Sequence, residues 1–393
     1  MKEIVIASAA RTAVGDFGGA LKDLSPTELG IETARAAIAR AGIAPDEVEQ
    51  AFYGNVIHTE PRDMYLSRTI AVGAGLSHSA PALTVNRLCG SGLQSVISGI
   101  QCLVLGDAEI VLAGGAESMS RAGYMLPSAR WGQKMGDTAA VDMMTAALND
   151  PFGHGQMGIT AENIAEEQGI TREQQDSFAA ASHRKAAHAI EAGYFKSQIV
   201  PVTLTSRKGL EVFDTDEHVR GDATEENLAK LRPVFKKNGT VTAGNASGLN
   251  DGAASLILMT QDAAARKGLL PLARIRAYGH SGVDPRVMGM GPVPAMQIAM
   301  KRAGLTVADL DIVESNEAFA AQACAVSQAL DLDPQKVNPN GGAVAIGHPI
   351  GASGAIILTK LLYELRRTGG TYGAATMCIG GGQGIALIVE ALA

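Results

Sequence analysis

Residues 40–55 read RAGIAPDEVEQAFYGN, and residues 302–316 read RAGLTVADLDIVESN. Each stretch runs from the end of an expected helix through Ala-Gly and an acidic turn into an apolar strand. The strand ends at an asparagine in both cases, Asn55 in the first and Asn316 in the second. Such similarity between distant segments indicates two copies of one structural unit, one near each end of the chain.

The repeat continues beyond these strands. The step along the chain from Ser91-Gly92 to Ser353-Gly354 equals the step from Arg40 to Arg302. Each Ser-Gly pair precedes an apolar helix pattern, LQSVISGIQCLVLG or AIILTKLLYELRRTG, and then a strand ending in glycines, AEIVLAGG or AATMCIGGG. Strands that are apolar throughout are buried by helices on both faces, as in a mostly parallel sheet. We therefore expect an α/β protein with a duplicated strand-helix-strand core.

The composition narrows the class of protein. The chain has 393 residues, of which 46% are hydrophobic and 19% charged, as expected of a globular protein with two or three domains. A net charge of −7 without a basic cluster argues against a nucleic-acid partner. The four cysteines form no C-x-x-C pair and no H-E-x-x-H is present, so we expect neither a disulfide framework nor a metal site.

The N-terminal stretch MKEIVIASAARTA could be mistaken for a signal peptide. Its apolar run is short and is flanked by Glu3 and Arg11, so a first β-strand is the better interpretation. No other apolar segment approaches the roughly 20 residues that span a bilayer. We expect a cytoplasmic protein without a membrane partner.

The region between the repeats, residues 119–249, is more charged and less regular. Thr171 and Gln174 form a capping-box pattern that predicts a helix start, and Gly193 predicts its end. His183 and His188 lie in this polar helix and are expected to be solvated. Long insertions of this kind often carry binding function.

Four segments are expected at the carboxyl ends of strands, where α/β proteins bind ligands: NRLCGSG, VESNEAFAAQ, NGGAVAIGHPIGASG and TMCIGGGQG. They contain Cys89, Asn316, His348 and Cys378. The glycine patterns match neither a P-loop nor a dinucleotide fingerprint, which argues against a nicotinamide enzyme.

Each of these four residues has a structural alternative. Cys89 precedes a helix whose free N–H groups and dipole would lower the thiol pKa, and Gly90 and Gly92 would let a substrate approach; otherwise it is a half-buried turn cysteine. His348 is either a base in a glycine-rich turn or a structural histidine. Cys378 fits a buried strand as well as a site, and Asn316 fits a helix N-cap as well as a polar role.

The longer segments resemble those of a known family. NRLCGSG, GGAESMS, GTVTAGNASGLNDGAA, NEAFAAQ, NGGAVAIGHPIGASG and CIGGGQG are similar, in order and spacing, to thiolase sequences. Within the thiolases the chain resembles acetyl-CoA acetyltransferases and bacterial β-ketothiolases, and the resemblance runs from Ile4 to the C-terminus. TEPRDMYL at residues 59–66 is more similar to the β-ketothiolase branch.

The resemblance implies a duplicated five-layer αβαβα fold. It implies an N-terminal domain at residues 1–271, with a loop domain inserted at 119–249, and a C-terminal domain at residues 272–393. It also implies a homotetramer made of paired dimers.

The implied activity is that of an acetyl-CoA C-acetyltransferase, which joins two acetyl-CoA molecules into acetoacetyl-CoA and CoA, or runs backwards as thiolysis. Cys89 would carry the acetyl group, His348 would take its proton, and Cys378 would remove the α-proton of the second acetyl-CoA. His348 and a water held by Asn316 would stabilise the enolate, and the N–H groups of Cys89 and Gly380 the tetrahedral intermediate. Coenzyme A thioesters are then substrates, and no cofactor is expected.

The resemblance also implies a CoA channel along the inserted domain. Ser247 and Ala243 would contact the pantetheine arm and Arg220 the nucleotide end. The channel would be lined by Met157, Phe235, Met288 and Phe319. Local cations would attract the anionic nucleotide: Arg207, Lys208, Lys236 and Lys237.

Two positions depart from the biosynthetic branch: Gln156, where many relatives carry histidine, and Asn227, where some carry serine. Three other functions stay open. They are a 3-ketoacyl-CoA thiolase of broader chain length, a thiolase-like acyl-CoA or lipid-binding protein without catalysis, and a ketoacyl synthase-like condensing enzyme. A second cysteine in CIGGGQG favours thiolase over the last of these.

Overall fold

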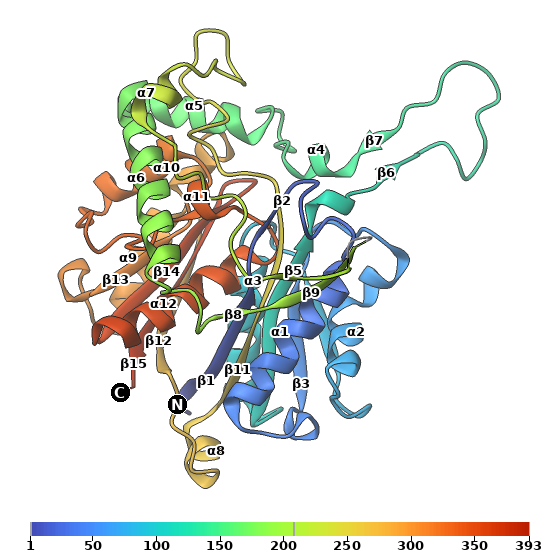
Figure 1. Cartoon of the computed structure of the whole chain (residues 1–393), viewed down its shortest axis with the longest axis vertical. Helices are drawn as coiled ribbons and strands as arrows, with labels where there is room; N and C mark the ends of the chain where they lie inside the picture. Colours follow the sequence, from blue (N-terminus) through green and yellow to red (C-terminus); the bar gives the residue numbers. More distant parts are fainter. Residues whose placement is uncertain (1, 207–208, 393) are drawn as a thin grey trace.

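The computed structural model describes residues 2–206 and 209–392. Its main sheet has the order β13-β14-β15-β12-β1-β11-β5-β3-β4 (Figure 1). The first half contributes β1 (Ile4–Thr12), β3 (Gln50–Gly54), β4 (Ala82–Val85), β5 (Ile110–Ser118) and β11 (Asn250–Thr260). The second half contributes β12 (Ala273–Gly282), β13 (Ile312–Ser315), β14 (Tyr372–Ile379) and β15 (Gln383–Ala391). Strands β1 and β12 pair at the centre and join the two halves.

Helices cover this sheet in layers. The two helices that follow the repeated Ser-Gly pairs, α3 (Ser91–Leu105) and α12 (Ser353–Thr368), pack against each other between the halves. Helices α1 (Pro26–Ala41) and α2 (Leu66–Gly73) cover the outer face of the first half, and α9 (Pro292–Ala303) and α10 (Ala320–Ala329) that of the second. Each half of the sheet forms one layer, so the order of the layers is helix, sheet, helix, sheet, helix. This is the five-layer order that the sequence resemblance implied.

The central helices cross where both repeats carry glycine. A Cβ on Gly92 would lie 2.7 Å from the backbone nitrogen of Ala355, and one on Gly354 would overlap the backbone of Leu93. A Cβ on Gly90 would meet the side chain of Ile379. The prediction that Gly90 and Gly92 make room for a substrate is therefore wrong, because protein atoms occupy that space.

The central strands are buried as predicted, but the sheet is not mostly parallel, as the sequence had suggested. Every residue of β1, β5 and β11 is buried. However, β1 pairs antiparallel with both β11 and β12, and β14 pairs antiparallel with β15. Parallel pairs occur at β3–β4, β3–β5 and β13–β14. Burial on both faces follows from the helix layers whatever the strand direction, so an apolar strand pattern did not predict the mixed sheet.

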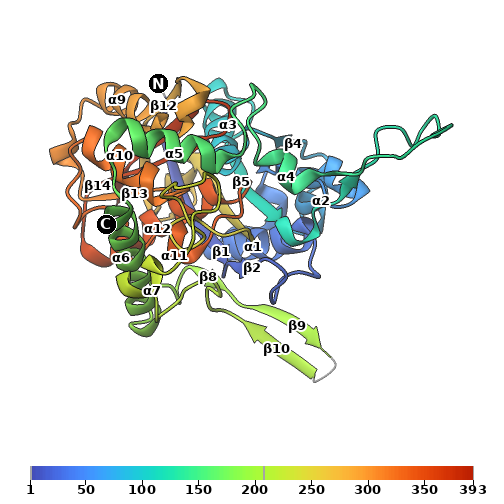
Figure 2. The same ribbon diagram turned by 90° about the horizontal axis from the view of Figure 1, so that it is seen from above.

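The inserted region contains helices and two projecting arms. Its elements are β6 (Tyr124–Met125), β7 (Val141–Asp142), α4 (Met143–Ala147), α5 (Met157–Gln168), α6 (Arg172–Glu191), β8 (Ile199–Val200), β9 (Val202–Ser206), β10 (Gly209–Phe213) and α7 (Glu225–Ala229). The β6–β7 arm extends from the body in Figure 1, and the β9–β10 hairpin does so in Figure 2. Three short elements lie elsewhere: β2 (Gly15–Asp16), α8 (Gln261–Arg266) and α11 (Ala343–Ile346).

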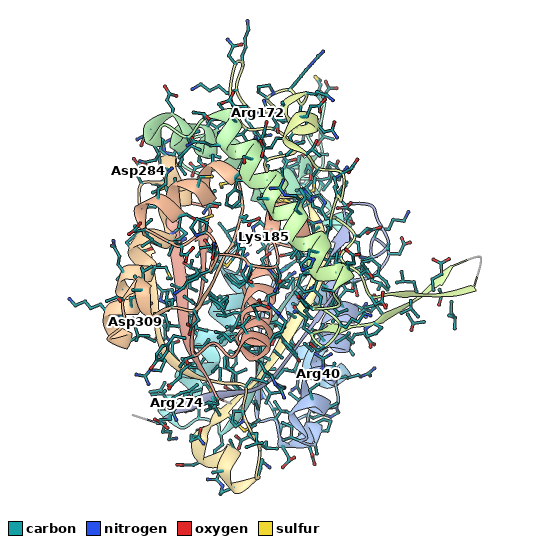
Figure 3. The ribbon with its side chains drawn as sticks, turned by 60° about the vertical axis from the view of Figure 1, so that its left-hand side comes forward. Arg40, Arg172, Lys185, Arg274, Asp284 and Asp309 are labelled. Atoms are coloured by element: carbon teal, nitrogen blue, oxygen red, sulfur yellow. The ribbon has the colours of Figure 1, made fainter. Side chains whose placement is uncertain are left out.

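Helix α6 ties the inserted region to the second half. Its capping box is present, with Thr171 and Gln174 bonded reciprocally. Near its start Arg172 forms an ion pair with Asp176 at 2.7 Å. Arg172 also donates to the carbonyl of Leu228 in the last turn of α7. Further along, Lys185 donates to the carbonyl of Val337 at 3.1 Å. Figure 3 labels Arg172 and Lys185 on this helix.

Two sequence expectations need qualification here. His183 on α6 is buried and not solvated, because the segment around Arg220 covers it, and burial lowers its pKa to about 4.

The stretch Leu88–Leu105, with mean hydropathy 1.5, is long and apolar enough by composition to cross a membrane. Its residues pack against α12 and the strands of both halves, which accounts for its apolar character.

Candidate active site

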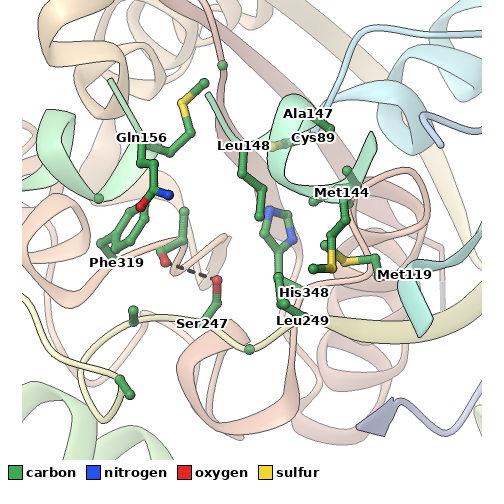
Figure 4. A pocket seen from close by; sticks show the side chains of 18 of the residues that line it. Cys89, Met119, Met144, Ala147, Leu148, Gln156, Ser247, Leu249, Phe319 and His348 are labelled. Atoms are coloured by element: carbon green, nitrogen blue, oxygen red, sulfur yellow. Dashed lines mark hydrogen bonds between the residues drawn. The ribbon is translucent and has the colours of Figure 1, made fainter. Parts of the chain in front are cut away.

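A cavity of about 490 Å³ opens between the two halves and the inserted region (Figure 4). Eleven of the twelve candidate catalytic and CoA-binding residues line it: Cys89, Met157, Arg220, Phe235, Ala243, Ser247, Met288, Phe319, His348, Cys378 and Gly380. They come from the turn before α3, from β14 and the turn after it, from the loop after α11, from the segments before α9 and α10, and from the inserted region. Segments far apart in the sequence thus meet in one mainly apolar space.

Cys89 lies on a sharp turn between β4 and α3. The preceding residue, Leu88, has a backbone φ of +45°, which residues other than glycine rarely adopt. Backbone N–H groups of Gly380 and of Cys89 itself bond the sulfur and favour the thiolate, yet burial outweighs them. The pKa of the Cys89 thiol is raised to about 11 by burial, with a further contribution from the charge of Glu117.

This result corrects the expectation of a lowered thiol pKa at a helix N-terminus. Cys89 stands just outside the helix, at a place where neighbouring side chains remove water from the sulfur, and desolvation disfavours the charged form. Cys89 is therefore a neutral thiol near neutral pH. A nucleophilic role requires a base beside it.

His348 has the properties of such a base. Its Nδ1 lies 2.6 Å from the hydroxyl of Ser353, and its backbone N–H donates to Oδ1 of Asn250 at 2.8 Å. Its Nε2 is buried and has no partner among the described residues. Burial lowers the His348 pKa to about 4, so the imidazole is neutral near pH 7 and can accept a proton.

Cys378 is the last residue but one of β14, just before the glycine turn that leads to β15. Gly381 and Gly382 have φ of +80° and +83°, which explains why glycines occupy this turn. The pKa of Cys378 is raised by burial and, to a smaller extent, by negative charge on Cys89. Both cysteines line the same cavity.

Asn316 does not line this cavity. It is 1% exposed, and neither atom of its amide has a partner among the described residues. It lines a second, much smaller cavity of about 10 Å³, together with Glu314, Ser353 and Lys360. It is not a helix N-cap either, because α10 begins at Ala320 with Phe319 in the cap position. Two unpartnered amide atoms beside a space of about one water are what a water-holding side chain would show.

The channel residues divide between the inserted region and the second half. Phe235 and Phe319 meet edge to face with ring centroids 6.2 Å apart, and Met157, Met288 and Cys378 pack in one cluster with Phe319. The hydroxyl of Ser247 donates to the carbonyl of Ala318 at 3.0 Å, the bond drawn in Figure 4. This bond fixes the loop that carries Ala243 and Ser247 against the second half.

The charged end of the channel is less simple than the sequence suggested. Arg220 is exposed at the rim, and its backbone N–H donates to Nδ1 of His183 at 3.2 Å. Lys236 is paired with Glu166 at 2.7 Å. Lys237 is exposed, whereas Arg207 and Lys208 lie outside the described residues.

Sequence reasoning missed three polar residues of the site. His218 lines the main cavity and forms an ion pair with Asp16 if it is protonated. Asn250 bonds the backbone of His348, and Ser353 bonds its ring. The segments NASGLNDGAA and GHPIGASG contain Asn250 and Ser353, but nothing in the spacing showed which side chains meet there.

The two departures noted in the sequence differ in position. Gln156 precedes α5 and lines the cavity. Asn227 lies in α7, where its side chain donates to the carbonyl of Asp222 at 3.2 Å, and it does not line the cavity.

Within residues 2–206 and 209–392, no group of three or more histidine, cysteine, aspartate or glutamate side chains could hold a metal ion.

Comparison with known proteins gives a consistent result. Residues 4–262 match the family model described as thiolase, N-terminal domain, and residues 269–391 match thiolase, C-terminal domain. The chain is 61% identical over 390 residues to beta-ketothiolase BktB of Cupriavidus necator and 52% identical over 391 residues to an acetyl-CoA acetyltransferase of Thiocystis violacea, in both cases over 99% of each chain. The crystal structure of human mitochondrial 3-ketoacyl-CoA thiolase in complex with CoA has a TM-score of 0.97, with 45% identity over 100% of this chain and 98% of that one.

Proposed function

Since the chain belongs to the thiolase family of acyltransferases, we propose that it is an acetyl-CoA C-acetyltransferase of the β-ketothiolase type that works through acetyl-Cys89. The reaction joins two acetyl-CoA molecules into acetoacetyl-CoA and CoA and is reversible as thiolysis. One observation carries the proposal. Cys89, Cys378 and His348 line one mainly apolar cavity, where burial raises the pKa of both thiols and lowers that of the imidazole.

In the first half-reaction, Nε2 of His348 takes the proton of Cys89. The resulting thiolate attacks the acetyl carbonyl, and the N–H groups of Cys89 and Gly380 stabilise the oxyanion that forms. When the tetrahedral intermediate collapses, the C–S bond to CoA breaks and the departing thiolate takes the proton of Cys378. His348 remains protonated, and Cys378 becomes the thiolate.

In the second half-reaction, Cys378 removes the α-proton of a second acetyl-CoA. The enolate oxygen accepts a hydrogen bond from Nε2–H of His348. The resemblance to thiolases implies a second donor, a water held by the amide of Asn316, and this water would have to bridge the small cavity and the main one, because Asn316 does not line the latter. The carbanion attacks acetyl-Cys89, acetoacetyl-CoA leaves, and His348 returns its proton to Cys89. The raised pKa values suit this exchange, because each sulfur must take its proton back at the end of a step.

The substrate thioester would lie along the channel with its pantetheine arm against Ala243 and Ser247. Met157, Phe235, Met288 and Phe319 would exclude water from it, and Arg220 at the rim would meet the anionic nucleotide end. The homotetramer, the cytoplasmic location and the division into residues 1–271, with 119–249 inserted, and 272–393 remain predictions from the sequence.

The second candidate is a 3-ketoacyl-CoA thiolase of broader chain length. It is favoured by the volume of the cavity that holds Cys89, about 490 Å³, and by the apolar side chains in its wall, which include Met144, Leu148, Leu249 and Ile350 (Figure 4). The test is CoA-dependent thiolysis, comparing kcat/KM for acetoacetyl-CoA, 3-oxovaleryl-CoA and 3-oxohexanoyl-CoA. A preference of tenfold or more for the four-carbon substrate supports the acetyltransferase, whereas comparable values support the broader enzyme.

A binding protein without catalysis is a third candidate, and alkylation separates it from the other two. If Cys89 is activated by His348, iodoacetamide modifies it faster than Cys102, which is buried on α3 away from the cavity. Equal or slower modification of Cys89 would favour the non-catalytic alternative.

A further inference from the structure

Ser353 is the first residue of α12, and its side chain faces the ring of His348. Its hydroxyl lies 2.6 Å from Nδ1 of His348 and donates to the carbonyl of Pro349 at 2.9 Å. Ser353 is 3% exposed and does not line the main cavity, so it has no direct access to a substrate there. The ring of His348 is thus held on one side by a hydroxyl and presents Nε2 on the other.

The carbonyl of Pro349, which also accepts from the backbone N–H groups of Ala352 and Ser353, is the acceptor within reach of the Ser353 hydroxyl hydrogen. A serine hydroxyl carries one hydrogen and two lone pairs. When its hydrogen is used on the carbonyl of Pro349, the oxygen presents only a lone pair to Nδ1. Nδ1 must then carry a hydrogen, and in the neutral imidazole this leaves the lone pair on Nε2.

We propose that Ser353 is a positioning residue that holds His348 in the Nδ1–H tautomer, so that Nε2 is always the nitrogen that exchanges a proton with Cys89. This inference rests on the proposed function, because it assumes that His348 takes the proton of Cys89. The Nδ1–H to Ser353 bond is the same in the neutral and protonated ring. His348 therefore accepts the proton of Cys89, donates a hydrogen bond from Nε2–H and returns the proton without any rearrangement behind the ring.

The partner is a neutral hydroxyl, not a carboxylate. A carboxylate would favour the protonated ring and raise its pKa, whereas a hydroxyl bonds both states without adding charge. The backbone bond from His348 to Asn250 fixes the loop, but it does not discriminate between tautomers because it involves no ring atom. Ser353 is the described residue that bonds the ring.

The test compares Ser353→Ala with Ser353→Thr, which keeps the hydroxyl, and with Thr359→Val. Thr359 is the matched control: it is buried on the same helix, and its hydroxyl donates to the carbonyl of Ala355 at 2.8 Å, away from the histidine. The readouts are the rate of acetyl-enzyme formation from acetyl-CoA in a stopped assay and the KM for acetyl-CoA. Circular dichroism and melting temperature report folding.

We expect Ser353→Ala to form acetyl-enzyme about 10- to 100-fold more slowly, with KM within about twofold of the wild type, because the wrong tautomer becomes populated. Ser353→Thr should recover most of the rate, and Thr359→Val should match the wild type. Acetylation of Ser353→Ala at the wild-type rate would overturn the inference. So would equal losses in the alanine and threonine variants, since that pattern would indicate packing.

A separate variant distinguishes failure of this inference from failure of the proposed function. His348→Asn should lose far more acetylation activity than Ser353→Ala. If His348→Asn acetylates normally, the proposed base is wrong and Ser353 has nothing to position. If His348→Asn is inactive and Ser353→Ala is normal, only the role of Ser353 is wrong.

Discussion

The two halves of the molecule start the same helix in the same way and then use it differently. Ser91 begins α3, and its hydroxyl donates to the backbone carbonyl of Leu88 at 2.6 Å and accepts from the N–H of Arg87. Ser353 begins α12, donates to a backbone carbonyl in the same manner, and in addition bonds the ring of His348. The duplication places a serine at the start of each helix, and the presence of His348 beside Ser353 gives only the second serine a side chain to bond.

The repeated asparagines differ in the same sense. Asn55 donates to the carbonyl of Ala116 and to the carboxylate of Glu117, both at 3.0 Å. Glu117 in turn accepts from the backbone of residues 56, 57 and 351 and so holds loops of both halves. The side-chain amide of Asn316 has no partner among the residues that the structure describes. Oδ1 of Asn55 has no partner among the described residues either, so the two copies differ at the amide nitrogen: that of Asn55 stabilises the fold, whereas that of Asn316 is left to hold water.

The largest expected difference between the halves concerns the two cysteines. Cys89→Ala should abolish the acetyl-enzyme, because no other residue in the proposed mechanism carries the acetyl group. Cys378→Ala should still form acetyl-enzyme, more slowly, but lose about 10²- to 10⁴-fold in condensation and thiolysis. Intact-mass spectrometry after mixing with acetyl-CoA, together with steady-state assays, checks both. Retained turnover in Cys89→Ala would refute the mechanism.

The asparagine pair should show opposite effects. Asn316→Ala should reduce kcat by about 10²- to 10³-fold, as expected when a group that stabilises an oxyanion is lost, with little change in stability. Asn55→Ala should lower the free energy of unfolding by about 1–3 kcal/mol, because it leaves buried acceptors unpaired. Kinetics and denaturant unfolding of both variants test this. If both variants lost only stability, Asn316 would be a structural residue.

The glycine pair should show that the two helices need the same close approach. Gly92→Ala and Gly354→Ala should each destabilise the protein by about 1–3 kcal/mol, because a Cβ would press on the backbone of the opposite helix. Gly99 on α3 is a less crowded comparison, since a Cβ there would meet side chains at 3.0 Å. Melting temperatures rank the three variants. A Gly354→Ala protein as stable as the wild type would contradict the crossing described above.

The smallest effect is a pH dependence. Since burial raises the Cys89 pKa to about 11, its alkylation by iodoacetamide should rise by up to about tenfold per pH unit above neutrality. Cys378 has its pKa raised as well and should react more slowly, being fully buried. Peptide mass spectrometry separates the two sites. A Cys89 rate that levels off below about pH 8 would show instead a thiolate paired with protonated His348.

The same raised pKa values act on stability. A thiol whose pKa is higher in the folded state contributes stability below its unfolded pKa and loses that contribution as the pH rises toward about 11. The free energy of unfolding should therefore fall on the alkaline side, and less so in Cys89→Ala.

Much of this protein was determined by its sequence. Equal spacing of Arg40 and Ser91 with Arg302 and Ser353 predicted the duplication, apolar strands predicted the buried sheet, and Thr171 with Gln174 predicted the start of α6. These features depend on periodicity and on hydrogen bonds within one turn, which neighbouring residues alone determine. The resemblance to thiolases also directed attention to Cys89, Asn316, His348 and Cys378.

Only the tertiary structure decided how those residues behave. Burial by other segments raised the pKa of Cys89 against the effect of the helix N-terminus, made His183 an interior residue, and placed Asn316 in a cavity of its own. The glycines beside Cys89 leave room for protein atoms, Gly90 for the side chain of Ile379 and Gly92 for α12, and the hydroxyl of Ser353 bonds the ring of His348. Desolvation and hydrogen-bond pairing depend on which distant segments cover a group, and local sequence does not contain that information.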